Sequence, residues 1–203
     1  MKSIKLKLKL FVTLIVLAIS NNSNAQAFEE GVSMASLGFG FPNLSATWMK
    51  TYSIMDADIQ QSSFGPLHLK FEYGLTDKLG IGASFNFTSA SITEEVWNYT
   101  EKISFNSFNA LIRLNYHYLD HDKVDFYTGI GMGYNRNNFK FETTNPSLDI
   151  DEEVAILNQL YNVIPLGFES TIGLRYLFTD NIGAYMELGW SKSLMQFGVV
   201  GRF

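Results

Sequence analysis

The segment LHLKFEYGL, residues 67–75, alternates strictly between apolar and polar side chains. One face carries Leu67, Leu69, Phe71, Tyr73 and Leu75. The other face carries His68, Lys70, Glu72 and Gly74. A period of two indicates a β-strand with two unlike faces. The apolar face would be the core of a soluble protein but the lipid-facing surface of a membrane barrel, so the fold depends on which face meets water.

The same alternation recurs along the chain and predicts a meander of strands. The eight expected strands are residues 31–41, 67–75, 79–87, 108–118, 124–134, 164–178, 182–190 and 194–203. Tight turns are expected near Asp77, Asp120 and Asp180, and long polar links at residues 42–64, 90–104 and 142–160. A meander whose long connections all lie at one end is typical of an antiparallel up-and-down transmembrane β-barrel.

The N-terminal segment has the features of a secretory signal peptide. Four lysines precede an apolar run of about ten residues, from Leu10 to Ile19, and a polar stretch ends at Ala25. A membrane-spanning helix needs roughly 20 apolar residues, so an uncleaved anchor is the weaker alternative. We therefore predict a signal peptide at residues 1–25 and a barrel domain at residues 26–203.

Composition narrows the classes of partner. Removal of the four N-terminal lysines changes the formal net charge from -5 to about -9, which argues against nucleic acid as a partner. The chain has no cysteine, so disulfides and thiolate metal sites are excluded. No cofactor is expected.

The polar face of the predicted strands is best placed inside the barrel. Glycines dominate this face on the odd-numbered strands, and long charged side chains lie mostly on the even-numbered ones. The charged set is Lys70, Glu72, Arg113, Glu169, Arg175 and Glu187. An eight-stranded barrel has an interior just wide enough for side chains, and three cations balance three anions as burial requires. We predict a closed, salt-bridged lumen, with a narrow small-solute channel as the alternative.

Aromatic residues on the apolar face agree with this orientation. Tyrosines 73, 116, 118 and 176 lie next to the short turns, and Tyr134 and Trp190 lie toward the other end. Two such bands match the aromatic girdles of a membrane barrel. The apolar face is therefore predicted to point outward, into lipid.

The signal peptide, eight alternating strands, short turns and C-terminal Phe203 together resemble the small outer-membrane β-barrels of Gram-negative bacteria, the OmpA/OmpX-like group. This resemblance implies a cell outer membrane location among lipid and lipopolysaccharide, a periplasmic N-terminus and long loops that face outside. It also implies that the barrel-assembly machinery reads Phe203 as a signal. The fold hosts adhesins, channels, enzymes and structural proteins, so it does not fix an activity.

Few residues have a pattern typical of catalysis or nucleotide binding. The glycines of residues 129–133 lack the spacing of a nucleotide-binding loop and a following helix. His117 and His121 lie at or near a predicted turn, whereas His68 lies toward the outer rim, within possible reach of Asp56 and Asp58. A hydrogen bond inside the lumen is the favoured role of His68, with a site on the rim as the alternative.

The third long link contains a predicted amphipathic helix. Val154, Leu157, Leu160 and Tyr161 follow a helical spacing. Asp149 is expected to cap this helix reciprocally with Glu152. Asp149, Asp151, Glu152 and Glu153 are also a weak candidate for a divalent-cation site, against the simpler interpretation of a solvated acidic surface.

The sequence thus predicts a non-enzymatic outer-membrane barrel with a structural or surface-interaction role carried by three long loops. The partner expected for such a role is an extracellular ligand of unspecified class. Two alternatives stay open: a narrow small-solute channel, and an enzyme that hydrolyses lipid or peptide at the rim.

Overall fold

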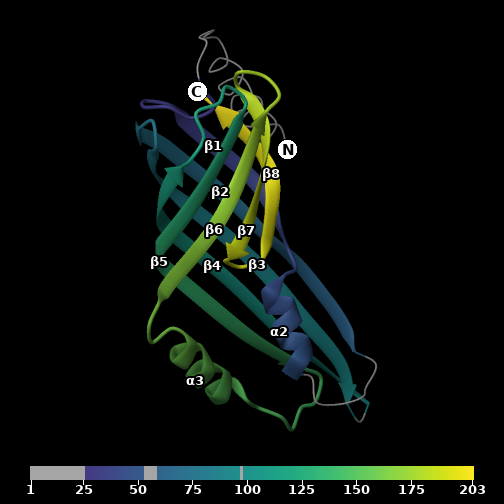
Figure 1. The fold of residues 1–203 in the computed structure, drawn as a ribbon. Helices are drawn as coiled ribbons and strands as arrows, with labels where there is room; N and C mark the ends of the chain where they lie inside the picture. The colour runs from purple at the N-terminus through teal and green to yellow at the C-terminus, as the bar shows by residue number, and fades with distance from the viewer. Residues whose placement is uncertain (1–25, 53–58, 97) are drawn as a thin grey trace, which may run out of the picture.

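The computed structural model describes residues 26–52, 59–96 and 98–203. The predicted signal peptide, residues 1–25, lies outside the described residues and stays a prediction. The described residues form eight antiparallel strands that close into a barrel in chain order (Figure 1). Each strand pairs with its neighbour in sequence, and β8 closes the ring on β1. The up-and-down barrel predicted from the sequence is confirmed.

The strands differ in length, and two described helices lie at one end of the barrel. The strands are β1 (Ser33–Phe41), β2 (Gln60–Thr76), β3 (Leu79–Val96), β4 (Tyr99–His117), β5 (Val124–Thr143), β6 (Leu166–Leu177), β7 (Ile182–Trp190) and β8 (Met195–Arg202). The helices are α2 (Leu44–Tyr52) and α3 (Asp151–Tyr161). Neither of these described helices has the length and hydropathy needed to cross a membrane. We call the end with α2 and α3 the helix end, and the end with the C-terminus and the short turns the turn end (Figure 1).

The apolar face of the strands points outward, as predicted. The outward residues Leu69, Phe85 and Ile172 are 52%, 45% and 53% exposed, although they are fully apolar. The intervening Arg113 and Glu169 are 2% and 0% exposed inside the barrel. A closed cylinder with an apolar exterior and a charged interior is a transmembrane β-barrel.

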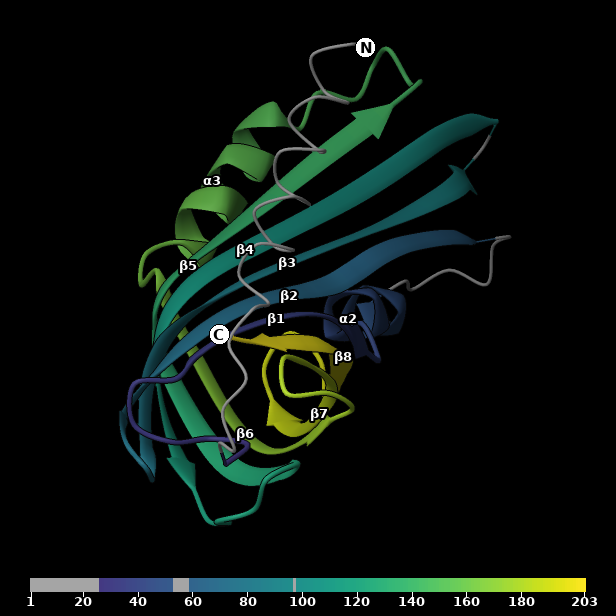
Figure 2. The ribbon, with the colours of Figure 1, turned by 90° about the horizontal axis from the view of Figure 1, so that it is seen from above.

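The four longest strands continue past the rest of the barrel. Strands β2 to β5 have 17, 18, 19 and 20 residues, whereas β1, β7 and β8 have 9, 9 and 8. Figure 2 shows β2 to β5 running on beyond the ring that β6, β7, β8 and β1 complete. We call this continuation the extended sheet; it consists of residues 60–66, 88–96, 99–107 and 135–143.

The prediction of three long polar links was therefore wrong in large part. Most of the predicted link at residues 90–104 is a strand pair that runs to Val96 and Tyr99. The predicted link at residues 42–64 contains α2 and the start of β2, and β5 continues into the predicted link at residues 142–160 before α3 begins. Regular backbone hydrogen bonds thus hold much of what the sequence pattern had assigned to loops.

The physical reason for this error is a reversal of polarity along the same strands. On the outer face of β5, exposed Met132 and Tyr134 are followed by exposed Arg136 and Lys140. On its inner face, the charge and glycine of the barrel give way to apolar side chains such as Phe139. An apolar outer face suits lipid and a polar outer face suits water, so the reversal marks the edge of the membrane. The alternation continues, but in the opposite sense.

Helix α2 covers part of the inner face of the extended sheet. Ala46 and Met49 of the helix form a buried apolar cluster with Ala90 and Ile92 of β3. Asn43 accepts a hydrogen bond from the Ala46 backbone N–H at 3.0 Å at the start of the helix. The extended sheet thus has a small apolar core of its own on its inner face, which is the face that lines the lumen in the closed part of the barrel.

Helix α3 covers the free edge of β5. Strand β5 pairs with β6 only as far as Tyr134, so its later residues have no strand partner on that side. The Asn158 amide accepts from Phe139 N at 2.7 Å and donates to Phe139 O at 2.9 Å. The Asn162 amide accepts from Asn137 N at 2.9 Å and donates to Asn137 O at 2.8 Å. Two asparagines one helical turn apart therefore replace a missing strand.

The predicted capping of α3 was wrong. The helix begins at Asp151, and its N-cap is Ile150, which makes no side-chain capping bond. The Asp149 carboxylate instead accepts from Asp151 N at 3.2 Å, a turn within the preceding loop that competes with helix capping. The acidic side chains at positions 149, 151, 152 and 153 are all exposed, and no group of three His, Asp or Glu side chains within the described ranges converges on a metal position.

Loss of the asparagine pair should expose the edge of β5. We expect Asn158→Ala together with Asn162→Ala to speed hydrogen exchange at the Asn137 and Phe139 amides by roughly three- to tenfold for each lost bond. Hydrogen–deuterium exchange of the protein in lipid nanodiscs measures this. Gln159→Ala, an exposed change on the same helix, should leave both amides protected; equal exchange in the two variants would contradict the edge-covering role.

Candidate functional site

The lumen toward the helix end is filled by an ion-pair cluster. Arg113 lies between two carboxylates, at 2.7 Å from Glu169 and 3.3 Å from Glu187. Lys70 Nζ is 2.5 Å from the Glu187 carboxylate, and the Tyr127 hydroxyl donates to the same carboxylate at 2.7 Å. Strands β2, β4, β6 and β7 therefore each contribute a charge to one cluster. Four of the six charged residues singled out from the sequence meet here.

A second cluster of buried charges lies next to the first, on the side of the turn end. Arg175 pairs with Glu72 and, at 2.9 Å, with Asp125. His117 contacts the same two carboxylates, with Nε2 at 2.9 Å from Glu72 and Nδ1 at 2.7 Å from Asp125. Both ring nitrogens face carboxylate oxygens, an arrangement that suits the doubly protonated imidazolium, in which both nitrogens donate. The Tyr127 ring, 4.0 Å from the Arg175 guanidinium, stacks between the clusters.

Asp125 and His117 were missing from the predicted charge set. His117 is the last residue of β4, so its assignment to a turn was nearly correct in sequence, but its ring is fully buried in the lumen. The alternation of β4 did contain the signal, because His117 and Arg113 lie on the same face. With both residues included, four cations and four anions balance in the two clusters, as burial requires.

The lumen has little free space. Phe28 closes the turn end, with its ring stacked on His117 at a centroid distance of 3.4 Å. A methyl group at Gly131 would lie 2.8 Å from Glu169 Cγ, so glycine leaves the room that this glutamate occupies. The cavity bordered by Lys70, Glu72 and Arg113 has a volume of about 10 Å³, which is near the minimum for one water molecule.

Beyond the charges toward the helix end, His68 links three elements by hydrogen bonds. His68 Nδ1 lies 2.6 Å from Asn86 Oδ1, and Nε2 lies 3.3 Å from the Ser193 hydroxyl. The hydrogen-bonding role predicted for His68 in the lumen is confirmed. Asp56 and Asp58, the partners considered for a site on the rim, lie outside the described residues.

Serine, histidine and asparagine in this order have the connectivity of a nucleophile, a base and its orienting group. Ser193 and His68 are both 0% exposed, however, and Asn86 is 1% exposed. The β1 backbone covers the pair so closely that a methyl group at Gly40 would lie 2.7 Å from His68 Nε2. With no room for a substrate carbonyl, this chain of hydrogen bonds fastens the β7–β8 connection over the lumen.

A structural role for Ser193 gives a clear expectation. Ser193→Ala should lower the free energy of unfolding by about 0.5 to 1.5 kcal/mol, the usual net value of one hydrogen bond. Hydrolysis of p-nitrophenyl butyrate by the wild-type protein in vesicles should equal that of empty vesicles. Ester hydrolysis that both Ser193→Ala and His68→Ala abolish would instead show a working nucleophile.

The buried ion pairs should dominate stability. Glu187→Gln leaves Lys70 and Arg113 short of one anion, so we expect a loss of about 3 to 5 kcal/mol. Glu142→Gln is the matched control, because Glu142 pairs with Lys102 at 3.6 Å on an exposed surface, and should cost less than about 1 kcal/mol. Urea unfolding in phospholipid vesicles, followed by gel mobility, compares the two. Equal losses would contradict a closed, salt-bridged lumen.

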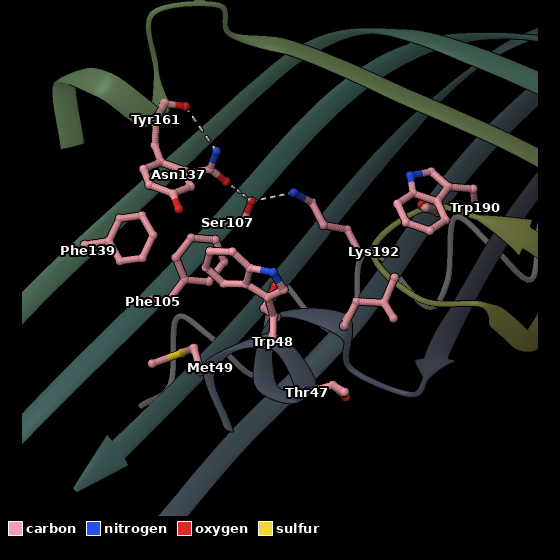
Figure 3. A pocket seen from close by; sticks show the side chains of 13 residues that line it. Thr47, Trp48, Met49, Phe105, Ser107, Asn137, Phe139, Tyr161, Trp190 and Lys192 are labelled. Carbon is pink, nitrogen blue, oxygen red and sulfur yellow. Dashed lines mark hydrogen bonds between the residues drawn. The ribbon is translucent and has the colours of Figure 1, made fainter. Parts of the chain in front are cut away.

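An apolar pocket lies at the helix end of the lumen, next to the polar side chains that fill the lumen. It has a volume of about 530 Å³, within the range of small-molecule sites. We call it the mouth pocket. Its lining residues are Leu44, Ser45, Thr47, Trp48, Met49, Phe105, Ser107, Asn137, Phe139, Tyr161, Trp190, Ser191 and Lys192 (Figure 3). Helix α2, the extended sheet, the end of α3 and the β7–β8 connection thus all contribute to its walls.

The walls and the floor of the mouth pocket differ in chemistry. Aromatic rings pack against one another along the wall, with centroid distances of 4.7 Å from Phe105 to Phe139 and 4.9 Å from Phe139 to Tyr161. Trp48 meets Tyr161 edge-on at 6.4 Å across the pocket. The floor is polar and contains Ser107 and Lys192 (Figure 3).

Lys192 occupies the boundary between the polar lumen and the apolar pocket. Its ammonium donates to the Ser107 hydroxyl and, at 2.7 Å, to Asn135 Oδ1. Within the described ranges, no carboxylate pairs with it. Burial lowers the pKa of Lys192 from 10.5 to about 8, because the charged form loses hydration without gaining an anion.

Sequence reasoning missed the mouth pocket. Trp48 falls in a predicted link, and Lys192 lies between two predicted strands. The available signal was the alternation of Ile103 with Phe105 and of Phe139 with Phe141, which indicates two strands that share an apolar face. That face was not recognised because it points inward, opposite to the apolar face of the barrel.

Phe203 follows β8 and lies next to Ser33, the first residue of β1. Its backbone exchanges two hydrogen bonds with Ser33, at 2.8 Å and 3.0 Å, and its side chain is 42% exposed. These contacts fasten the last strand to the first. Its part in assembly stays a prediction.

Comparisons with solved structures identify similar barrels. OprG from Pseudomonas aeruginosa matches with 10% sequence identity and a TM-score of 0.50, over 88% of this chain and 99% of that one. The N-terminal β-barrel domain of Pseudomonas aeruginosa OprF matches with 14% identity and a TM-score of 0.42, over 86% and 98%. Outer membrane protein W of E. coli matches with 14% identity and a TM-score of 0.43, over 87% and 99%. At such identities the likeness concerns the fold alone.

The sequence itself matches a family model. A comparison with curated proteins found no match. The model described as outer membrane protein beta-barrel domain, however, matches residues 11–188, which is most of the 203 residues. The chain therefore belongs to the outer membrane protein beta-barrel domain family, and its location is the bacterial outer membrane.

Proposed function

We propose that this protein is a sealed outer-membrane barrel that holds a binding site at the cell surface. The observation that carries the proposal is the mouth pocket itself, an apolar cavity of about 530 Å³ built on top of a filled lumen. A barrel that only anchored itself in the membrane would have no need for an extended sheet and two helices around such a cavity. The proposal assigns the surface-interaction role predicted from the sequence to this cavity.

The filled lumen favours binding over conduction. Glu187 and Arg113 lie across the barrel axis from one another, joined by ion pairs to Lys70 and Glu169. Passage of a solute would require these pairs to separate in a region from which water is largely excluded, which is energetically costly. The lumen cavity beside Lys70, Glu72 and Arg113, about 10 Å³ in volume, is too small for a solute and argues against the narrow-channel alternative.

The helix end is the end that we assign to the exterior. The outer face of the extended sheet is polar there, with exposed Arg136 and Lys140, and projects beyond the apolar band. Short turns gather at the opposite end, as in outer-membrane barrels whose short turns face the periplasm. Lipid and lipopolysaccharide would then surround the outward apolar side chains, and the barrel-assembly machinery would read Phe203 from the periplasmic side.

The proposal predicts an electrically silent barrel. Refolded full-length mature protein in planar bilayers should show no discrete conductance steps. A variant with Arg113→Ser and Glu169→Ser, which removes one buried pair without leaving a lone charge, should show steps if the pairs are the seal.

Two results would decide against the sealed barrel. One is stepwise current through the wild-type protein. The other is a silent record from the folded variant with Arg113→Ser and Glu169→Ser, because the buried pairs would then not be what closes the lumen. A folded gel mobility for each variant is the control that the barrel has formed.

A further inference from the structure

We propose that the mouth pocket binds a water-borne amphiphile with a single negative charge, such as a medium-chain fatty acid, with its carboxylate on Lys192 and its apolar chain among the aromatic rings. This inference rests on the proposed surface-binding function and names the class of ligand. It follows from three independent features: the apolar wall, the position of the cation, and the absence of acidic groups among the described residues of the lining.

The wall of the pocket suits an apolar chain. Trp48 is 48% exposed and Trp190 is 64% exposed, although both rings line a concave surface (Figure 3). Large apolar side chains that stay exposed in a concavity gain free energy when an apolar ligand replaces the water between them. Phe105, Phe139 and Tyr161 complete a wall with few polar groups, which offers few hydrogen-bond partners to a sugar or a polar peptide.

The cation at the floor suits an anionic head group. Lys192 has three N–H donors, and the described residues supply two acceptors, Ser107 and Asn135. Both acceptors are neutral, so they orient the ammonium without balancing its charge. A carboxylate at the third position would supply that balance and restore the pKa of Lys192 toward its ordinary value.

The other polar residues of the floor already bond to one another, so the ligand is expected to have its polar group only at the end that meets Lys192. The Ser107 hydroxyl, which accepts from Lys192, lies 2.6 Å from Asn137 Oδ1, to which it donates. The Asn137 amide in turn donates to Tyr161 O at 3.4 Å. Figure 3 shows this row along one side of the cavity. These groups are already paired, which leaves the ammonium as the main anchor for a polar head.

The lining also discriminates by charge. None of the described residues that line the mouth pocket is acidic, so a cationic amphiphile would meet Lys192 with no compensating carboxylate. Apart from Trp190, which borders it from the outward face of β7, the pocket lies at the helix end of the lumen on the inner side of the extended sheet. We therefore assign the ligand to the aqueous phase and not to the surrounding bilayer.

Octanoate and octanamide provide a matched pair of probes, because they share a chain and differ in the charge of the head. Calorimetric titration of the full mature chain in zwitterionic lipid nanodiscs, with empty nanodiscs subtracted, should show at least roughly tenfold tighter binding of octanoate. Lys192→Met should abolish this preference while octanamide binding persists. Lys123→Met, the same change at the turn end, should leave the preference intact.

The pH dependence supplies a second readout. Lys192 must be protonated to hold an anion, so the dissociation constant for octanoate should be steady below pH 8 and rise by roughly tenfold per pH unit above it. Octanamide binding should not change over that range, and Lys192→Met should remove the dependence for octanoate.

The outcomes separate this inference from the proposed function. Equal binding of the two probes, lost in Trp48→Ala, would overturn the anion preference but leave an apolar surface site. If a folded, non-conducting barrel binds neither probe, the inference about the ligand is overturned, but the proposal of a sealed barrel is not. Loss of both octanoate and neutral octanamide binding when the nanodisc contains anionic phosphatidylglycerol would show that bilayer lipid occupies the pocket, which would overturn the assignment to a water-borne ligand.

Discussion

The outer face of every strand must match the medium around it, and the rest of this structure depends on that constraint. Where the medium is lipid, the outer face carries residues such as Leu69 and Ile172, and the backbone must be paired within a closed ring. Where the medium is water, the continuation of β5 carries Arg136 and Lys140 outward. Because alternate side chains point to opposite faces, each choice for the exterior also fixes what lies inside.

The interior therefore changes from charge to aromatic rings along one axis. Within the lipid band, the inward side chains are polar, and in so narrow a cylinder they are stable only when cations and anions meet. Arg113, Arg175 and their carboxylate partners satisfy this requirement. Beyond the band many inward side chains are apolar, such as Phe105 and Phe139, and the two helices shield them from water only in part. Lys192 lies where the polar lumen meets the apolar inner face of the extended sheet. The mouth pocket therefore has an apolar wall and a charged floor.

The sequence predicted the barrel well because a period of two is a local signal. The strand at residues 182–190 agrees with the structure to the residue, and six charges of the lumen could be named from alternation and charge balance alone. Asp125 and His117 belong to the same pattern but lie beside turns, where alternation is hard to distinguish from loop polarity. The ion partners themselves depend on barrel closure, which brings Lys70 and Glu187 together across 117 positions of sequence.

The mouth pocket was not predictable in the same way. Phe105 and Phe139 carry the same alternation as the barrel strands, but their meaning depends on whether lipid or water lies outside, and that depends on the height of each residue above the membrane. Trp48 and Lys192 reach the pocket from connections whose paths no periodic pattern encodes. Asn158 and Asn162, which cover the edge of β5, have a spacing that indicates a shared helix face but not the strand that they contact.

The reversal of polarity on the outer face can be measured directly, because the chain has no native cysteine. Met132→Cys and Lys140→Cys place single thiols on the same face of β5, on either side of the reversal. In intact cells, a membrane-impermeant maleimide should label Cys at position 140 and spare Cys at position 132, which a lipid-borne spin label should reach instead. Labelling of both positions from water, or of neither, would contradict a membrane edge between them.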